Sequence, residues 1–214
     1  MENFKKSKSL ENKSELVRAK EKAKIIDNLP IQILEGRSIS LLEISSDYDI
    51  EDFYNLVNSN EDFSHFVSRG FKNNQDFESF KEEIAKWFNS RTNFIFLCKR
   101  KTENLASFGV VILYDLNTLK DEVSLSVFLE EEKRNSQIFS QIFLLISDFI
   151  FNKLDIESAK FEIYSDNEYM LNMVRKREKF GVKEEESSRK DLKKFTLSKN
   201  EGKHLLFKFK DLYL

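Results

Sequence analysis

The fold is decided by one stretch, Val123-Ser124-Leu125-Ser126-Val127-Phe128-Leu129-Glu130-Glu131-Glu132-Lys133-Arg134-Asn135-Ser136-Gln137-Ile138-Phe139-Ser140. An alternating apolar segment, typical of a strand, runs here through a short charged turn into a long apolar helix. The start of such a helix offers unpaired N–H groups and the positive end of a dipole, which suit the pyrophosphate of a nucleotide-like cofactor. The glycines that usually bring the backbone close to a phosphate are missing from this turn.

The composition describes an ordinary globular chain. Its 214 residues suffice for one domain of two packed layers, and a net charge of -2 creates no overall field that favours nucleic acid or a membrane. Cys98, the single cysteine, follows an apolar run and fits an inert strand residue in a reducing compartment. No apolar run approaches about 20 residues, and the start lacks a signal-peptide core. We expect a cytoplasmic protein that does not associate with membranes.

The N-terminal region differs from the rest. Residues 1–36 are rich in Lys and Glu, and their apolar residues are too sparse for a strong core stripe. We expect a helical or partly disordered extension, either a solvated, fraying helix or an arm that contacts a partner or a second subunit. Residues 37–214 then form the main domain.

The elements of that domain follow from the hydrophobic spacing. A strand over 39–44 leads through Ser45-Ser46-Asp47, which supplies N-cap chemistry, into a helix, and a second helix covers 75–89. Three strands with short turns, over 93–100, 105–114 and 122–129, predict an antiparallel meander.

The C-terminal half predicts a change of strand direction. A helix over 136–153 joins the strand 122–129 to a strand over 160–164, and such a crossover makes the two strands parallel. A helix over 167–179 follows, and we expect the tail to pair a strand over 193–197 with one over 204–212. The fold class is α+β: a mixed, mostly antiparallel sheet with one parallel pair, flanked by helices and preceded by the N-terminal helical extension.

An ordered set of residues accompanies these elements. It comprises Val127-Phe128-Leu129, Arg134 at the start of the turn, Asp148 in the helix, Ser165-Asp166-Asn167 after the next strand, and Phe180-Gly181-Val182 followed by Lys183-Glu184-Glu185. With the order of the elements, this set resembles the GNAT superfamily of acetyl-CoA-dependent N-acetyltransferases, particularly the branch that modifies ribosomal-protein N-termini. The resemblance covers roughly residues 37–214.

The resemblance implies acetyl-CoA as cofactor and assigns residues to it. The backbone of Val127, Phe128 and Leu129 would hold the pantetheine arm, Asn167 would lie beside it, and the loop would hold the pyrophosphate, through the residues Arg134, Asn135, Ser136 and Gln137. The family's loop glycines correspond to Asn135, Gln137 and Phe139, so the loop is degenerate. Glu130, Glu131 and Glu132 precede it and would repel a phosphorylated cofactor.

Acyl transfer to an amine needs a base for the amine and an acid for the leaving thiolate. The candidate base is Glu122, at the start of the central strand, and its alternative reading is a solvated turn acid. Many family members place the acid, a tyrosine, in the helix after the asparagine. Val174 stands at that position, and Tyr169 is the candidate nearby. His65, in the region where this family shapes its acceptor site, is a candidate base or a structural histidine.

Other features leave the function open. The two histidines do not cluster with metal ligands, so the sequence predicts no metal site. Two hypotheses remain: a working N-acetyltransferase that acetylates a protein N-terminus or a small-molecule amine, or a non-catalytic protein of the same fold that binds a protein or ribosomal partner. A homodimer is compatible with both.

Overall fold

Eight strands form one sheet in the part of the chain that the computed structural model describes, which is residues 2–61, 63, 71, 74–88, 91–102 and 106–213. Their spatial order is β1 (Ile33–Glu35), β2 (Ile39–Glu43), β3 (Phe94–Arg100), β4 (Gly109–Asn117), β5 (Glu122–Leu129), β6 (Ser158–Tyr164), β8 (Leu192–Ser198) and β7 (Lys183–Glu185). β5 and β6 are parallel, and the other neighbouring strands in this sheet are antiparallel. The predicted mixed sheet with one parallel pair is confirmed.

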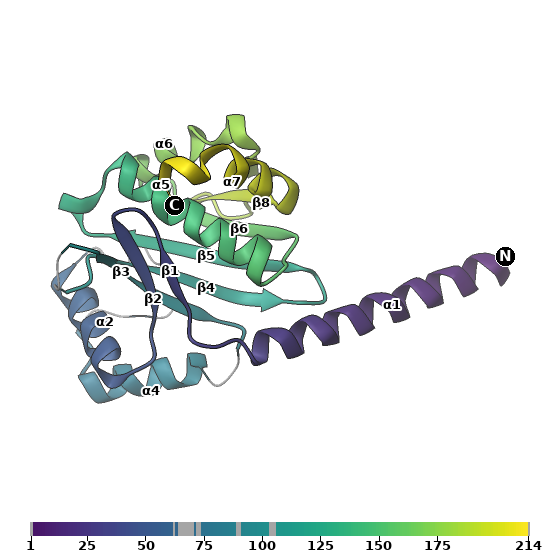
Figure 1. Cartoon of the computed structure of the whole chain (residues 1–214), viewed down its shortest axis with the longest axis horizontal. Coiled ribbons are helices and arrows are strands. Elements are labelled where there is room, and N and C mark those ends of the chain that lie inside the picture. The colour runs from purple at the N-terminus through teal and green to yellow at the C-terminus, as the bar shows by residue number, and fades with distance from the viewer. Residues whose placement is uncertain are drawn as a thin grey trace.

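Helices cover both faces of the sheet (Figure 1). One layer contains α2 (Asp47–Ser59) and α4 (Phe77–Phe88). The other contains α5 (Ser136–Asp148), which continues as a π-helical turn over Phe149–Lys153, then α6 (Glu168–Arg175) and α7 (Lys199–Tyr213). The flanking helices agree with the predicted α+β class.

Strand β3 shows how one sequence serves both layers. Phe94, Phe96 and Cys98 belong to the core beneath α5, whereas Ile95 and Leu97 belong to the core beneath α2 and α4. Successive strand side chains point to opposite faces, so a strand that is covered on both sides must be apolar throughout. Burial raises the pKa of the Cys98 thiol far above its usual range, which makes this cysteine unreactive.

Two helices begin at polar residues whose side chains cap the helix N-terminus. Ser46 caps α2, and it forms a reciprocal capping box with Asp49, as the serine pair before this helix predicts. Asn135 caps α5, and its side chain accepts a hydrogen bond from the Ile138 amide at 2.9 Å. The α5 cap lies in the turn that decides the fold.

The tail differs from the prediction. The strand expected over 204–212 is instead part of α7, and the second C-terminal strand is β7, which pairs with β8. The reason is a helix start at Ser198, whose hydroxyl donates to the Glu201 carboxylate at 2.5 Å. α7 then packs on α5 through Leu144, Leu205 and Leu206. Phe207 and Phe209 alternate with lysines in the sequence, but they lie on a helix, where Phe207 is 89% exposed.

The N-terminal extension is helical for most of its length, as α1 (Glu2–Asp27), and α1 projects away from the sheet (Figure 1). Its last turns contact the body: Ala19 and Ile26 are buried, and Lys22 Nζ lies 2.6 Å and 2.8 Å from the Asp121 carboxylate oxygens. β1 follows and joins the sheet edge. The boundary at residue 36 stays a prediction, and His65 lies outside the described residues. No helix within the described ranges has the length and apolar character needed to cross a membrane.

Candidate functional site

The parallel strands β5 and β6 separate partway along their length. They pair from Glu122 with Ser158 to Leu125 with Phe161. β5 then continues for four residues to Leu129, and β6 for three to Tyr164, beyond the last paired residues. A cleft with about 730 Å³ of free space, part of it open to solvent, lies at this separation. Backbone groups along the diverging edges face the cleft, where an extended ligand can bind them.

The lining of this cleft is mostly apolar. It combines residues of β5, β6, α5 and α6, among them Val127, Phe139, Phe161, Asn167 and Met170. The shape and chemistry fit an elongated ligand of low polarity with a few amide groups.

A second, smaller pocket adjoins the cleft and has about 280 Å³ of free space, part of it open to solvent. It shares Val127, Asn167 and Met170 with the cleft. Six residues that sequence analysis selected lie around this pocket: Val127, Phe128, Leu129, Arg134, Asn167 and Tyr169. The structure therefore brings together the strand end, the first residue of the loop and the start of α6.

Arg134 and Asn167 are held in place around this pocket. Arg134 Nε donates to the Leu129 carbonyl at 2.8 Å, and its guanidinium carbon lies 5.9 Å from the centre of the Phe128 ring. Asn167 caps α6 by accepting a hydrogen bond from the Met170 amide at 3.1 Å. Asn167 Oδ1 is therefore engaged in the fold, and its side-chain amide N–H groups stay suited to a ligand carbonyl.

Tyr169 places a phenol hydroxyl in the same region. The hydroxyl oxygen is buried and has no hydrogen-bond partner among the described residues. Burial raises the pKa of Tyr169, and the positive charges of Arg134 and Arg177 oppose this effect. The group is thus protonated at neutral pH, and a buried unpaired donor favours a ligand acceptor.

The loop before α5 uses its own backbone donors. A 3₁₀ turn covers Glu131–Lys133, and the amides of Lys133, Arg134 and Asn135 donate to the carbonyls of Glu130, Glu131 and Lys133, respectively. The Ile138 amide is satisfied by Asn135. These four donors are bonded within the protein, so an anion at this helix start would compete with its own carbonyls and cap.

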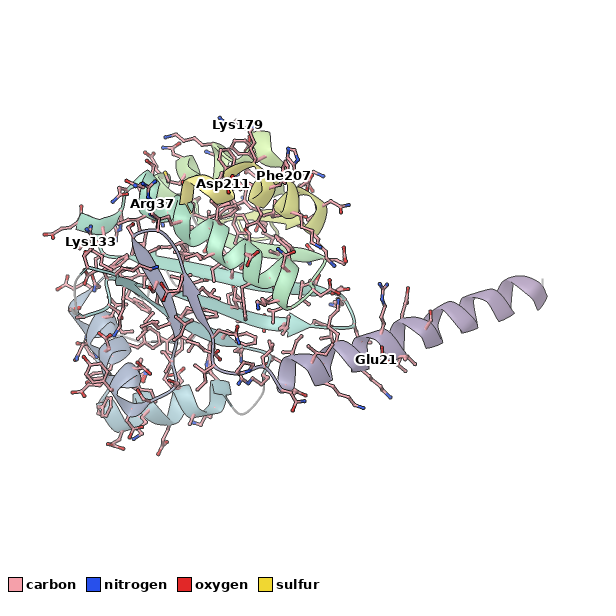
Figure 2. The ribbon with its side chains drawn as sticks, in the orientation of Figure 1. Glu21, Arg37, Lys133, Lys179, Phe207 and Asp211 are labelled. Carbon is pink, nitrogen blue, oxygen red and sulfur yellow. The ribbon has the colours of Figure 1, made fainter. Side chains whose placement is uncertain are left out.

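Of the four predicted loop residues, Arg134 alone borders the smaller pocket. Asn135, Ser136 and Gln137 are exposed, and Ser136 borders a separate groove between α5, α6 and α7. Lys133, labelled in Figure 2, belongs to the same loop. Phe139, at a family glycine position, is a core residue whose ring centre lies 4.7 Å from the Arg177 guanidinium carbon.

Glu122 lies away from the open part of the cleft. It is at the paired end of β5, opposite Ser158, and its carboxylate forms an ion pair with Lys160. The separation of the strands begins after Leu125, about 10 Å further along the strand. This position, next to the turn before β5, favours the alternative reading of Glu122 as a solvated turn acid.

Glu162 is a carboxylate that sequence reasoning missed. It lies on β6 where the strands separate, borders the cleft, and pairs with Lys194 Nζ at 3.4 Å. The signal was present in the alternation of β6, which places Lys160, Glu162 and Tyr164 on the face opposite Phe161. No group of His, Cys, Asp or Glu in the described segments is arranged to hold a metal ion.

The fold has many solved counterparts. The apo form of FdhC, a nucleotide-linked sugar GNAT, superposes with a TM-score of 0.67 at 19% identity, over 85% of this chain and 98% of that chain. A GCN5-related N-acetyltransferase from Brucella melitensis gives 0.65 at 16% identity, over 86% of each chain. Spermidine N-acetyltransferase from Vibrio cholerae, in complex with CoA and spermine, gives 0.65 at 16%, over 77% of this chain and 98% of that chain.

Sequence comparison adds no closer relative. No protein-family model matches the chain, and no curated protein matches it. At identities of 16–19%, the structural likeness concerns the fold. The chain has the fold of the GNAT acetyltransferases.

Proposed function

We propose that this protein is an acetyl-CoA-dependent N-acetyltransferase that acts on an amine of a protein N-terminus or a small molecule. The observation that carries the proposal is the cleft between β5 and β6, with the unpaired Tyr169 hydroxyl in the adjoining pocket. The fold supports it, since neighbours of the same fold include N-acetyltransferases, one of them in complex with CoA. A link to the ribosomal-protein branch rests on the sequence resemblance alone.

The residues fit one part of acetyl-CoA better than another. The apolar cleft with its diverging strand edges suits the pantetheine arm, which is thin and carries two amides. The phosphate end meets a loop in which the amides of Lys133, Arg134, Asn135 and Ile138 are already bonded. Glu131 and Glu132 are exposed beside it. Lys133 and Arg134 supply compensating charge. We infer that the pantetheine arm contributes more to affinity here than the pyrophosphate does.

When bound, acetyl-CoA would supply an acetyl group activated as a thioester. The apolar walls of the cleft exclude water, which limits loss of the acetyl group to hydrolysis. The cap of α6 by Asn167 fixes the first turn of that helix and therefore the position of Tyr169. Tyr169 holds a proton that a leaving sulfur requires.

The test is isothermal titration calorimetry of the full chain with acetyl-CoA, CoA, pantetheine and 3′-phospho-ADP. We expect micromolar affinity for acetyl-CoA, about 8 kcal/mol, and measurable competition by pantetheine. Absence of binding at millimolar acetyl-CoA would contradict the proposal.

A second candidate is the non-catalytic protein of the same fold, and the bonded amides of the loop favour it. The Asn135→Gly variant separates the two. Glycine is tolerated at an N-cap at a cost of a few tenths of a kcal/mol, and it frees the Ile138 amide. Tighter acetyl-CoA binding by this variant than by the wild type would show that the site still serves the cofactor. Asn200→Gly, a change of an exposed residue in the first turn of α7 that borders neither the cleft nor the smaller pocket, is the matched control. If neither the wild type nor either variant binds acetyl-CoA, the non-catalytic function is favoured.

A further inference from the structure

The cleft between β5 and β6 continues past the point where the two strands separate. Pairing of these strands ends at Leu125 and Phe161. Ala159 lies two residues inside the paired part, and Leu197 of β8 pairs with it, yet both line the cleft. On the opposite wall the lining extends to Ile150, in the π-helical turn that follows α5. The cleft therefore reaches beneath α5, over the closed part of the sheet.

This inner end of the cleft is apolar. Its walls are buried side chains that belong to one hydrophobic core cluster: Leu125, Ile146, Ile150, Ala159, Phe161 and Leu197. Ser147 also borders the cleft, and its hydroxyl donates to the Phe143 carbonyl of the same helix at 2.7 Å. A space with such walls offers water few hydrogen-bond partners, so it favours a hydrocarbon group.

The polar lining residues lie elsewhere along the cleft. Ser126 and Glu162 follow the last paired residues of their strands, and Tyr164 and Asn167 lie still further from the paired part. The cleft thus changes from partly polar at the separation of the strands to apolar beneath α5. One ligand can match both parts only if a polar arm leads into an apolar end.

The length of the inner end follows from the elements that form it. From Phe161 to Ala159 the strand advances about 7 Å, and from Ile146 to Ile150 the helix advances about 6 Å. The floor and the roof therefore agree on a space that is longer than a single methyl group and comparable to a short alkyl chain.

The order of the residues along the cleft gives the direction in which a ligand would lie. Arg134 borders the smaller pocket, which shares Val127, Asn167 and Met170 with the cleft. The inner end is reached after these shared residues. A thioester whose phosphate end lies near Arg134 and whose arm passes Val127 would point its acyl group toward the inner end.

We propose that the inner end holds the alkyl part of an acyl group longer than acetyl, so that the preferred donor is an acyl-CoA of intermediate length, such as hexanoyl-CoA. This inference rests on the proposed function and names the acyl group for it, with acetyl-CoA as a shorter and weaker donor. The amine nitrogen bonds to the acyl carbonyl carbon, the carbon–sulfur bond breaks, and one amine proton passes to the sulfur. The products are the longer amide and the free thiol.

The first test is isothermal titration calorimetry of the full wild-type chain with acetyl-, butyryl-, hexanoyl-, decanoyl- and palmitoyl-CoA. Each methylene added between acetyl and hexanoyl should tighten binding about two- to fourfold, because it leaves water for an apolar wall. The gain should stop at decanoyl-CoA, since the lining ends at Ile150 and Leu197. This series needs no variant.

The second test fills the inner end. Ala159→Leu should lower the ratio of hexanoyl-CoA affinity to acetyl-CoA affinity at least about tenfold, because the larger side chain takes the space of the alkyl chain. Val57→Leu is the matched control. It enlarges a buried side chain beneath α2 and α4 that borders neither the cleft nor the smaller pocket, and it should leave the ratio unchanged. Urea unfolding of both variants shows that they are folded.

The outcomes separate this inference from the proposed function. Equal affinities for acetyl- and hexanoyl-CoA, or an unchanged ratio in folded Ala159→Leu, would overturn the inference and leave the acetyltransferase function standing. Affinity that rises without limit through palmitoyl-CoA would indicate nonspecific alkyl binding and would also overturn it. Binding of hexanoyl-CoA without binding of acetyl-CoA would support the inference and overturn acetyl-CoA as the donor. Failure of every acyl-CoA to bind would overturn both.

Discussion

The buried hydroxyl of Tyr169 lowers the free energy of unfolding. A buried hydroxyl without a partner loses its water and gains no hydrogen bond in return, which costs about 1–3 kcal/mol. Chains rarely keep such a group in a packed region, because phenylalanine fills the same space without the polar atom. Under the proposed function, this hydroxyl would donate to a ligand in the pocket beside the cleft.

The Tyr169→Phe variant should therefore change stability and activity in opposite directions. We expect the free energy of unfolding to stay the same or rise by about 1 kcal/mol, while kcat falls about 100-fold. Urea unfolding and steady-state kinetics measure the two effects. Tyr48→Phe, which alters an exposed tyrosine on α2, is the control. A stable variant with unchanged kcat would remove Tyr169 from the mechanism.

At the scale of elements, sequence reasoning succeeds where the hydrophobic period is unambiguous. The strands β3 and β5 and the crossover through α5 were predictable. β3 is a continuous apolar run, whereas β5 and α5 repeat apolar residues at the period of their elements. α7 was not, because its Phe207 to Phe209 alternation resembles a strand. The Ser198 and Glu201 pair at its start is a capping signature that outweighs that alternation.

In the candidate site, too, some features were predictable from the sequence and others were not. Its backbone parts, Val127–Leu129, and the helix start at Asn167 follow from the order of the elements. Glu162 was missed because its importance depends on where β5 and β6 stop pairing, and that point is fixed by three-dimensional packing and not by any local pattern. The loop is a related case, since only the structure shows that four amides there, those of Lys133, Arg134, Asn135 and Ile138, are bonded internally.

The attachment of α1 yields a prediction at this scale. Ala19, Lys22 and Ile26 contact the body, whereas Leu16 and Val17 are exposed. Deleting residues 1–17 should leave Tm nearly unchanged. Deleting residues 1–28 removes the burial of Ile26, about 2 kcal/mol, and should lower Tm by about 4–8 °C. Differential scanning calorimetry of both truncations measures this difference. Equal Tm values would mean that the contacts of α1 contribute nothing to stability.

At the scale of the whole molecule, a charged cluster joins distant segments. Lys22 of α1 bonds Asp121, in the turn between β4 and β5, and Lys199 of α7 bonds Asp155 and Glu157, which precede β6. The hydrogen bond from Lys199 holds the pKa of Asp155 below its usual value. The cluster links the terminal helices α1 and α7 to the same end of the central strands β5 and β6.

This cluster gives the fold a dependence on acidic pH. A carboxyl whose pKa is lower in the folded state stabilises the fold above its unfolded pKa, and that stabilisation is lost as the pH falls through the folded value. The contribution of this cluster to the free energy of unfolding, measured with urea, should therefore be constant from pH 8 to about pH 5 and decrease below about pH 4. Lys199→Met should reduce the dependence by about 1 kcal/mol or less, since the pair is partly exposed. If the free energy of unfolding of Lys199→Met depends on acidic pH as strongly as that of the wild type, the Lys199 ion pairs are not the cause of the dependence.

The net charge of α1 differs in sign from that of the rest of the chain. α1 has eight Lys and Arg residues against five Asp and Glu, while the rest of the chain is acidic. A basic arm on an acidic body is compatible with contact between copies or with an acidic partner, and both stay predictions.

The projecting helix has a hydrodynamic consequence. Its 26 residues extend about 39 Å, whereas a compact chain of 214 residues has a radius of gyration of about 17 Å. Friction grows with such an appendage although the mass does not, so the monomer should elute early from a sizing column and tumble slowly. An apparent dimer by elution volume is then compatible with a single elongated chain, and only a mass measurement, such as light scattering, separates the two.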